Sequence, residues 1–161
     1  MKKLLLTALL FSCISVYAQE KSPYLLNEIK ISPSLFLQGM ESISYERIVG
    51  KDGTVSIELL YDFTKEHTPP KYKSNILAYY RLFFSNRENT TGLFVEWSVN
   101  RFNVMENSEL SKGYAGLGIA LGGKFVNKNK WVADIFLGYS RTLDVNYYAK
   151  PRMGLSVGRR F

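Results

Sequence analysis

The feature that most constrains this chain is a two-residue alternation of apolar and polar side chains over its last segment, residues 150–161. Met153, Leu155 and the terminal Phe161 fall on one face of this segment, while Arg152 and Arg160 fall on the other. A helix would mix the two sets, because its side chains repeat every 3.6 residues. The alternation therefore predicts a terminal β-strand with two chemically different faces.

The same alternation recurs along the chain and predicts an all-β fold. Turn sequences such as GKDG at 50–53 separate the alternating segments, since glycine supplies the positive φ that tight hairpins need. The predicted strands are 27–37, 42–49, 54–64, 74–84, 91–103, 113–126, 131–142 and 150–161. Segments of about ten residues span a bilayer when tilted, and single-chain bacterial barrels have an even number of strands. We therefore expect an eight-stranded antiparallel up-and-down transmembrane β-barrel.

The start of the chain has the features of a secretory signal peptide. Lys2 and Lys3 precede an apolar run at 4–11, and VYA at 16–18 is a small-residue cleavage site. The expected organisation is a signal peptide over 1–18, a periplasmic lead over 19–26 and the barrel over 27–161. Cys13 leaves lipidation open as an alternative, although its neighbours fit a lipoprotein cleavage box poorly. Cleavage after residue 18 leaves a chain without cysteine, so no disulfide is expected.

The volume of the apolar side chains decides which face of the barrel points outward. Eight strands enclose an interior that is just wide enough to be filled by side chains, and the apolar set is too bulky for it. The aromatic residues predicted to face lipid are Tyr61, Phe63, Tyr80, Phe84, Trp97, Phe125, Trp131, Tyr139 and Phe161. A membrane barrel is therefore favoured over a soluble barrel with an apolar interior.

The opposite face carries charges of both signs. The residues predicted to form a charge network in the lumen are Glu28, Lys30, Glu46, Glu58, Asp62, Arg81, Glu96, Lys124, Asp134, Arg152 and Arg160. Buried charges are costly unless they are paired, so we expect salt bridges that plug the lumen instead of an open pore. The glycines of segment 113–126 are expected to make room there for Phe36, Phe94 and Phe136.

Several short motifs, taken in order, resemble one protein family. They are SISYERIVG at 42–50, AYYRLF at 78–83, GLFVE at 92–96, GLG at 116–118 and GRRF at 158–161. The chain resembles an uncharacterised group of small outer-membrane barrels of Bacteroidetes over nearly its whole mature length. The resemblance implies an eight-stranded barrel similar in shape to OmpA- and OmpX-type proteins. It implies no activity, so it assigns no catalytic residues.

The sequence contains few residues suited to catalysis. Its one histidine, His67, lies in a predicted outer loop beside Glu66 and Thr68, and a lone histidine in a loop is more often a solvated residue than a catalytic base. We therefore predict no catalytic, cofactor-binding or metal-binding residues and no cofactor. Nucleic acid is not an expected partner, because the basic residues are spread over many strands among acids. A lipid-modifying enzyme and, as a third possibility, a narrow pore stay open as alternatives.

The leading expectation is a non-enzymatic barrel of the outer membrane. It would stabilise the envelope, or present the outer loops 65–73, 104–112 and 144–149 to a surface protein partner, because function often resides on loops held by a rigid frame. Lipopolysaccharide is an expected partner, and its anionic headgroups are suitable contacts for Lys65, Lys71 and Lys73. A loop in which these lysines are only solvated is the alternative. The C-terminal strand is the expected contact for the barrel-assembly machinery.

Overall fold

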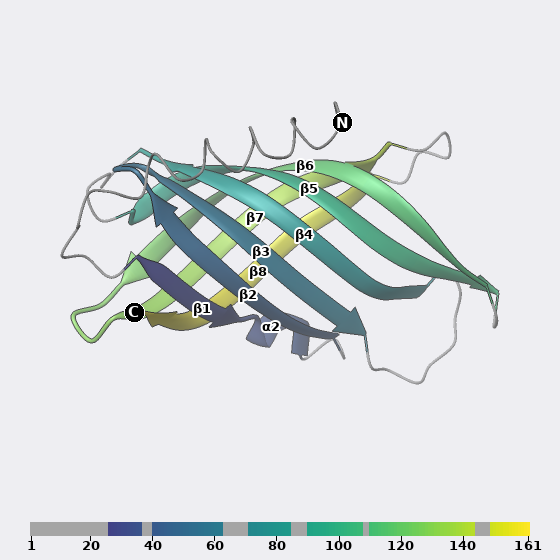
Figure 1. Ribbon diagram of the computed structural model, residues 1–161, viewed down its shortest axis with the longest axis horizontal. Coiled ribbons are helices and arrows are strands. Elements are labelled where there is room, and N and C mark those ends of the chain that lie inside the picture. Colours follow the sequence, from purple (N-terminus) through teal and green to yellow (C-terminus); the bar gives the residue numbers. More distant parts are fainter. Residues whose placement is uncertain (1–25, 37–39, 63–70, 85–89, 108–109, 144–148) are drawn as a thin grey trace, which may run out of the picture.

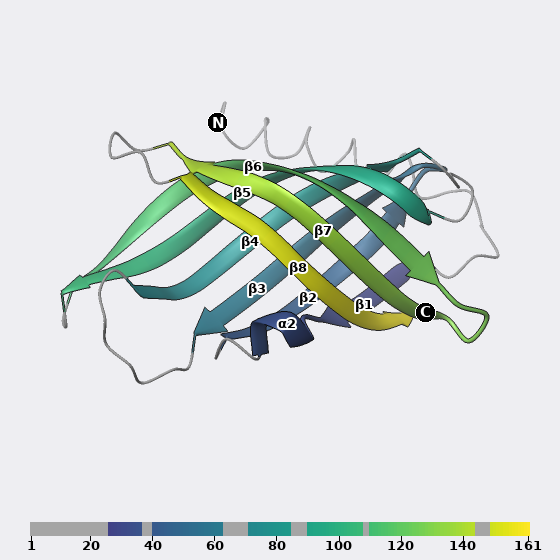
Figure 2. The ribbon, with the colours of Figure 1, turned by 180° about the vertical axis from the view of Figure 1, so that it is seen from behind.

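Eight antiparallel strands close into a barrel, as the alternation predicted (Figures 1 and 2). The computed structural model describes residues 26–36, 40–62, 71–84, 90–107, 110–143 and 149–161. Its elements are β1 (Asn27–Ile31), the one-turn helix α2 (Pro33–Phe36), β2 (Met40–Val49), β3 (Gly53–Asp62), β4 (Lys71–Phe83), β5 (Gly92–Asn107), β6 (Leu110–Val126), β7 (Trp131–Thr142) and β8 (Ala149–Arg160). No helix in these residues is long and apolar enough to cross a membrane.

The two ends of the barrel differ in construction. At one end, which we call the turn end, Asn27 and Phe161 exchange two main-chain hydrogen bonds of 2.9 and 2.8 Å. The β2–β3 connection lies at this end, with Gly50 at a φ of 73°, and so does the short β6–β7 turn. The opposite end, which we call the loop end, carries α2, at the lower centre of Figure 1, and the end of β5 at Asn107 with the start of β6 at Leu110, at the right of the figure.

The strands expose most of their aliphatic side chains and bury most of their charged ones, together with a few apolar and aromatic side chains. On β4, Leu77 and Tyr79 are buried whereas Ile76 and Tyr80 are exposed, and this division is the one that Arg81 predicted for the strand. On β8 from Pro151 onward, the even-numbered positions face inward and the odd-numbered ones outward. Because side chains alternate across a strand, the inside and outside of the barrel follow directly from the sequence pattern.

The predicted first strand, 27–37, is wrong in its second half. β1 ends at Ile31, and residues 33–36 form the helix α2. Proline lacks an N–H for a strand ladder but suits the first turn of a helix, and Pro33 occupies that position after Ser32, a residue type that favours helix N-caps. The pairing of β1 with β8 is correspondingly short, from Glu28 opposite Arg160 to Ile31 opposite Val157.

Two of the predicted outer loops are partly strand. Residues 71–73 belong to β4, and most of the predicted loop 104–112 lies in the extended β5 and β6, where Val104 is opposite Lys112. The two strands pair along the hairpin from Gly92 to Asn107, interrupted by one irregularity after Met105. The polar composition of residues 104–112 predicted a loop. Main-chain pairing between β5 and β6 holds these residues in strands all the same, because backbone hydrogen bonds do not require apolar side chains.

Candidate functional site

Ten charged side chains from all eight strands meet inside the barrel, and we call them the charge plug. They are Glu28, Lys30, Glu46, Glu58, Arg81, Glu96, Lys124, Asp134, Arg152 and Arg160. Five are acidic and five are basic, so their formal charges cancel. Asp62, the sixth predicted acid, is half-buried at the loop end of β3, opposite Met40.

Lys30 lies at the centre of the charge plug. Its ammonium donates hydrogen bonds to Glu46 at 2.5 Å and to Asp134 at 2.6 Å, and it lies 3.8 Å from Glu28. All four side chains are fully buried. Burial of an ammonium costs several kcal/mol unless counter-charges surround it. Carboxylates from β1, β2 and β7 supply these counter-charges.

Arg81 is the second hub and joins the centre to β5. Its Nε donates to Glu96 at 2.9 Å, while its Nη1 donates to Glu46 at 3.1 Å and to Asp134 at 2.6 Å. The Oδ2 atom of Asp134 therefore accepts from both Lys30 and Arg81. Its Oδ1 atom has no hydrogen-bond partner among the described residues. Removal of either cation would leave this carboxylate undercompensated.

At the turn end, the charge plug ties β8 and β6 to β1. Arg160 contacts Glu28 through Nε at 2.8 Å and through Nη2 at 2.6 Å. Lys124 donates to the same Glu28 at 2.8 Å and also to Glu46. The Arg160 guanidinium also donates to the hydroxyl of Thr90 at 3.3 Å. The short β1–β8 pairing is thus reinforced by side chains inside the barrel.

Toward the loop end, the charge plug finishes at Arg152. Its guanidinium donates to Glu96 and, at 3.2 Å, to Glu58. The hydroxyl of Ser42 donates to the other oxygen of the Glu58 carboxylate. The Arg152 side chain is 16% exposed, whereas that of Arg81 is 1% exposed. Arg152 therefore marks the boundary between the dry and the partly open parts of the lumen.

Aromatic rings fill the space around the cations. The Arg81 guanidinium carbon lies 4.3 Å from the ring centre of Phe94 and 4.6 Å from that of Tyr79. The Lys124 ammonium lies 5.1 Å from the ring centre of Phe83. Cations at these distances are attracted to the negative face of a ring. The rings therefore exclude water and also stabilise the charges.

Glycines give these rings their room, as the sequence predicted for Phe94. A Cβ at Gly122 of β6 would collide with the Phe94 ring, and one at Gly154 of β8 would lie 2.8 Å from the Phe136 ring. The second glycine was not predicted, because only the final register places β8 beside Phe136. The side chain of Phe36 lies outside the described residues.

The lumen beyond Arg152 is lined mainly by uncharged polar side chains, with Asp62 as a half-buried acid near the loop end. Its inward-facing residues include Asn75, Ser98, Asn100, Ser140 and Thr142. The Asn100 amide donates to Ser140 at 3.2 Å. Three buried oxygens lack a partner among the described residues: Asn75 Oδ1, Ser98 Oγ and Asn100 Oδ1. We call this region the polar half of the lumen.

The outer surface carries the aromatic residues predicted to face lipid. Those described are all exposed: Tyr61, Tyr80, Phe84, Trp97, Phe125, Trp131, Tyr139 and Phe161. Phe84, Phe125, Trp131 and Phe161 lie at or next to the strand termini of the turn end. Phe63 lies outside the described residues.

Ser34 is a structural residue that the sequence did not reveal. Its hydroxyl donates to the Leu155 carbonyl at 3.3 Å and accepts from the Leu155 N–H at 3.1 Å. It therefore satisfies the edge of β8 where β1 has ended. Pro33 inside a predicted strand was the available signal, because proline argues against an interior strand position.

Every charged side chain of the charge plug forms an ion pair with a side chain of the opposite charge, and aromatic rings pack around the cations. Among the described residues there is no group of three or more side chains suited to a metal ion. His67 and Lys65 lie outside the described residues, as do the side chains of Lys71 and Lys73. The expectations for these four residues stay predictions.

Comparisons with protein-family models, with curated proteins and with solved structures found no match to this chain. The resemblance to small outer-membrane barrels therefore stays a prediction, and the fold and the charge plug are what any function must be argued from.

Proposed function

We propose that this protein is an integral β-barrel of the bacterial outer membrane, and that it inserts there after its signal peptide at 1–18 has been removed. The observation that carries the proposal is the inverted distribution of side chains. Large apolar residues such as Leu93, Leu121 and Leu137 are about two-thirds exposed, while charges such as Glu46 and Asp134 are fully buried. This arrangement is unfavourable in water and favourable in lipid.

The extent of the apolar surface supports the same proposal. Exposed apolar side chains occur on every strand of the barrel and reach from Ile29 on β1 to Leu155 on β8. Soluble proteins rarely expose contiguous apolar patches of more than a few hundred Å². A closed barrel also leaves no unpaired sheet edge in the bilayer, apart from the seam that Ser34 caps.

The charge plug supports a structural role over a transport role. Five cations and five anions interlock across the lumen, and the Arg81 hub is surrounded by rings. Breaking such a network to admit an ion leaves charges uncompensated in a dry interior. The protein therefore acts as a rigid, plugged frame that stabilises the envelope or presents its loop end to lipopolysaccharide and to a surface protein.

Membrane insertion is tested with the two tryptophans, Trp97 and Trp131, which face outward on β5 and β7. The mature chain is refolded into vesicles that contain phosphatidylcholine brominated on its acyl chains. We expect strong quenching of both tryptophans, and faster migration of unheated than of heated protein in detergent gels. A protein that stays soluble without detergent, with unquenched tryptophans, would contradict the proposal.

The plug and the partner need separate measurements. In planar bilayers we expect no conductance steps from the refolded protein, and a steady channel would contradict the plug. Crosslinking in the native membrane, followed by mass spectrometry, tests the surface role. A stoichiometric protein partner is expected for an interaction protein, and capture of lipid alone would restrict the role to the envelope itself.

A further inference from the structure

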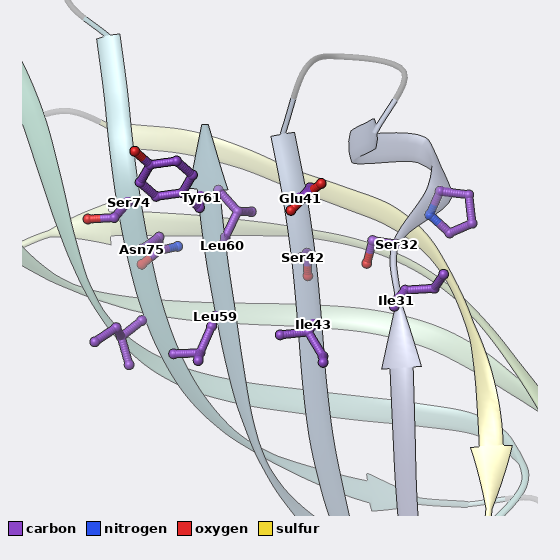
Figure 3. A pocket seen from close by; sticks show the side chains of 12 residues that line it. Ile31, Ser32, Glu41, Ser42, Ile43, Leu59, Leu60, Tyr61, Ser74 and Asn75 are labelled. Atoms are coloured by element: carbon purple, nitrogen blue, oxygen red, sulfur yellow. The ribbon is translucent and has the colours of Figure 1, made fainter. Parts of the chain in front are cut away.

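A furrow crosses the outer wall of the barrel beside α2, from β1 to β4 (Figure 3). It encloses about 730 Å³. One side of the furrow is a row of four exposed aliphatic residues that stand opposite one another in register: Ile31, Ile43, Leu59 and Ile76. This row lies within the apolar surface that the proposed function places in lipid.

The other side of the furrow is formed by side chains that end in polar oxygen atoms. Glu41, Tyr61 and Ser74 stand opposite one another on β2, β3 and β4, one outward position closer to the loop end. The intervening residues Ser42 and Leu60 lie between the two rows (Figure 3). The furrow is therefore amphipathic, with an aliphatic side toward the membrane core and an oxygen-rich side toward the surface.

Glu41 gives the furrow a charge. The Glu41 side chain is exposed, and its carboxylate forms no ion pair with any described residue. No basic side chain is among the described residues that line the furrow. By contrast, Arg101 on β5 and Arg141 on β7 are basic residues that face outward toward the loop end. Among the described side chains, the furrow therefore carries one negative charge and no positive charge, which is complementary to a cationic headgroup.

We propose that the furrow binds one membrane lipid whose headgroup carries a primary ammonium. An acyl chain lies along the aliphatic row, and the ammonium donates to the Glu41 carboxylate, with the hydroxyls of Tyr61 and Ser74 available to the rest of the headgroup. The assignment rests on the proposed insertion in the membrane. It goes beyond that function because it names one lipid class and one place on the barrel.

The test compares lipids with identical acyl chains and different headgroups. The refolded full mature chain in detergent micelles receives phosphatidylethanolamine, phosphatidylcholine or phosphatidylglycerol, and native mass spectrometry counts the lipids that stay bound. We expect one retained phosphatidylethanolamine and weaker retention of the other two. Glu41→Gln should reduce the retention of phosphatidylethanolamine about three- to fivefold, which is the range expected for loss of a partly exposed ion pair. It should leave the retention of phosphatidylcholine unchanged.

A furrow-filling variant separates this site from the rest of the apolar surface. Leu59→Trp should reduce retention of every lipid about tenfold, because the ring occupies the space of several buried methylenes. Ile135→Trp is the matched control, since Ile135 is similarly exposed on β7, on the other side of the barrel. It should leave retention unchanged.

Three results would overturn the assignment. Equal retention of phosphatidylglycerol and phosphatidylethanolamine would refute the role of Glu41. Retention that is insensitive to Leu59→Trp would place the lipid elsewhere, or show that protein covers the furrow. Quenching of Trp97 and Trp131 in brominated vesicles, measured on the same protein, shows whether the barrel is inserted. Quenching without any retained lipid refutes the furrow alone, and absence of quenching refutes the proposed function together with it.

Discussion

The two halves of the lumen solve the problem of buried polar groups differently. In the charge plug, Lys30 and Arg81 are surrounded by carboxylates at 2.5–3.1 Å. In the polar half, Ser98 and Asn100 leave oxygens without partners among the described residues. An unpaired hydroxyl or amide costs about 1–3 kcal/mol, whereas an unpaired charge costs far more. The difference teaches that charge, and not polarity as such, forces an interlocked interior.

The largest effect is expected at the centre of the charge plug. Lys30→Met leaves Glu46 and Asp134 with one cation fewer in a fully buried setting, and we expect it to lower the free energy of unfolding by about 3–5 kcal/mol. Urea unfolding of the protein in lipid vesicles, followed by tryptophan fluorescence, measures this. The balanced double variant Lys30→Met/Asp134→Leu should recover at least half of the loss. No recovery would show that packing, and not charge balance, makes Lys30 important.

An intermediate effect is expected at the boundary between the halves. Arg152→Gln removes a cation that is partly exposed, so water can hydrate the carboxylate of Glu58 that it leaves behind. We expect a loss of about 1–2 kcal/mol in the same unfolding assay, between the value of an exposed pair and that of a buried one. A loss as large as that of Lys30→Met would extend the dry region past Arg152 and weaken the comparison.

The smallest effect is expected in the polar half. Ser98→Ala removes a buried hydroxyl that has no partner among the described residues, and with it the cost of burying that group. We therefore expect no loss of stability, and a rise in the free energy of unfolding of at most about 1 kcal/mol. Ser156→Ala is the matched variant beside the charge plug, where the hydroxyl donates to Asp134 at 3.3 Å, and it should lower the free energy of unfolding by about 1 kcal/mol. Equal losses for the two serines would remove the distinction between the halves.

The sequence predicted which residues belong to the charge plug but not which of them form ion pairs with one another. Ten of the eleven residues expected in the lumen network meet in it, because inward-facing positions follow from the two-residue period. The pairs themselves join residues far apart in the chain: Lys30 and Asp134 are 104 positions apart, and Lys124 and Glu28 are 96 apart. No local sequence pattern encodes which inward-facing charges lie at the same height along the barrel axis, and only charges at the same height can pair across the lumen.

The sequence by itself determined the number of strands, their antiparallel order and, within the correctly predicted strands, the face that each side chain occupies. Alternation over two positions sets the face, whereas the short turns between successive segments indicate how many strands there are and that neighbours run antiparallel. Only the tertiary structure decided that β1 ends at Ile31, that Ser34 caps the edge of β8, and that β5 and β6 extend to Asn107 and Leu110. These features depend on the register with which the barrel closes, because a strand continues wherever a neighbouring backbone offers partners and stops where none does.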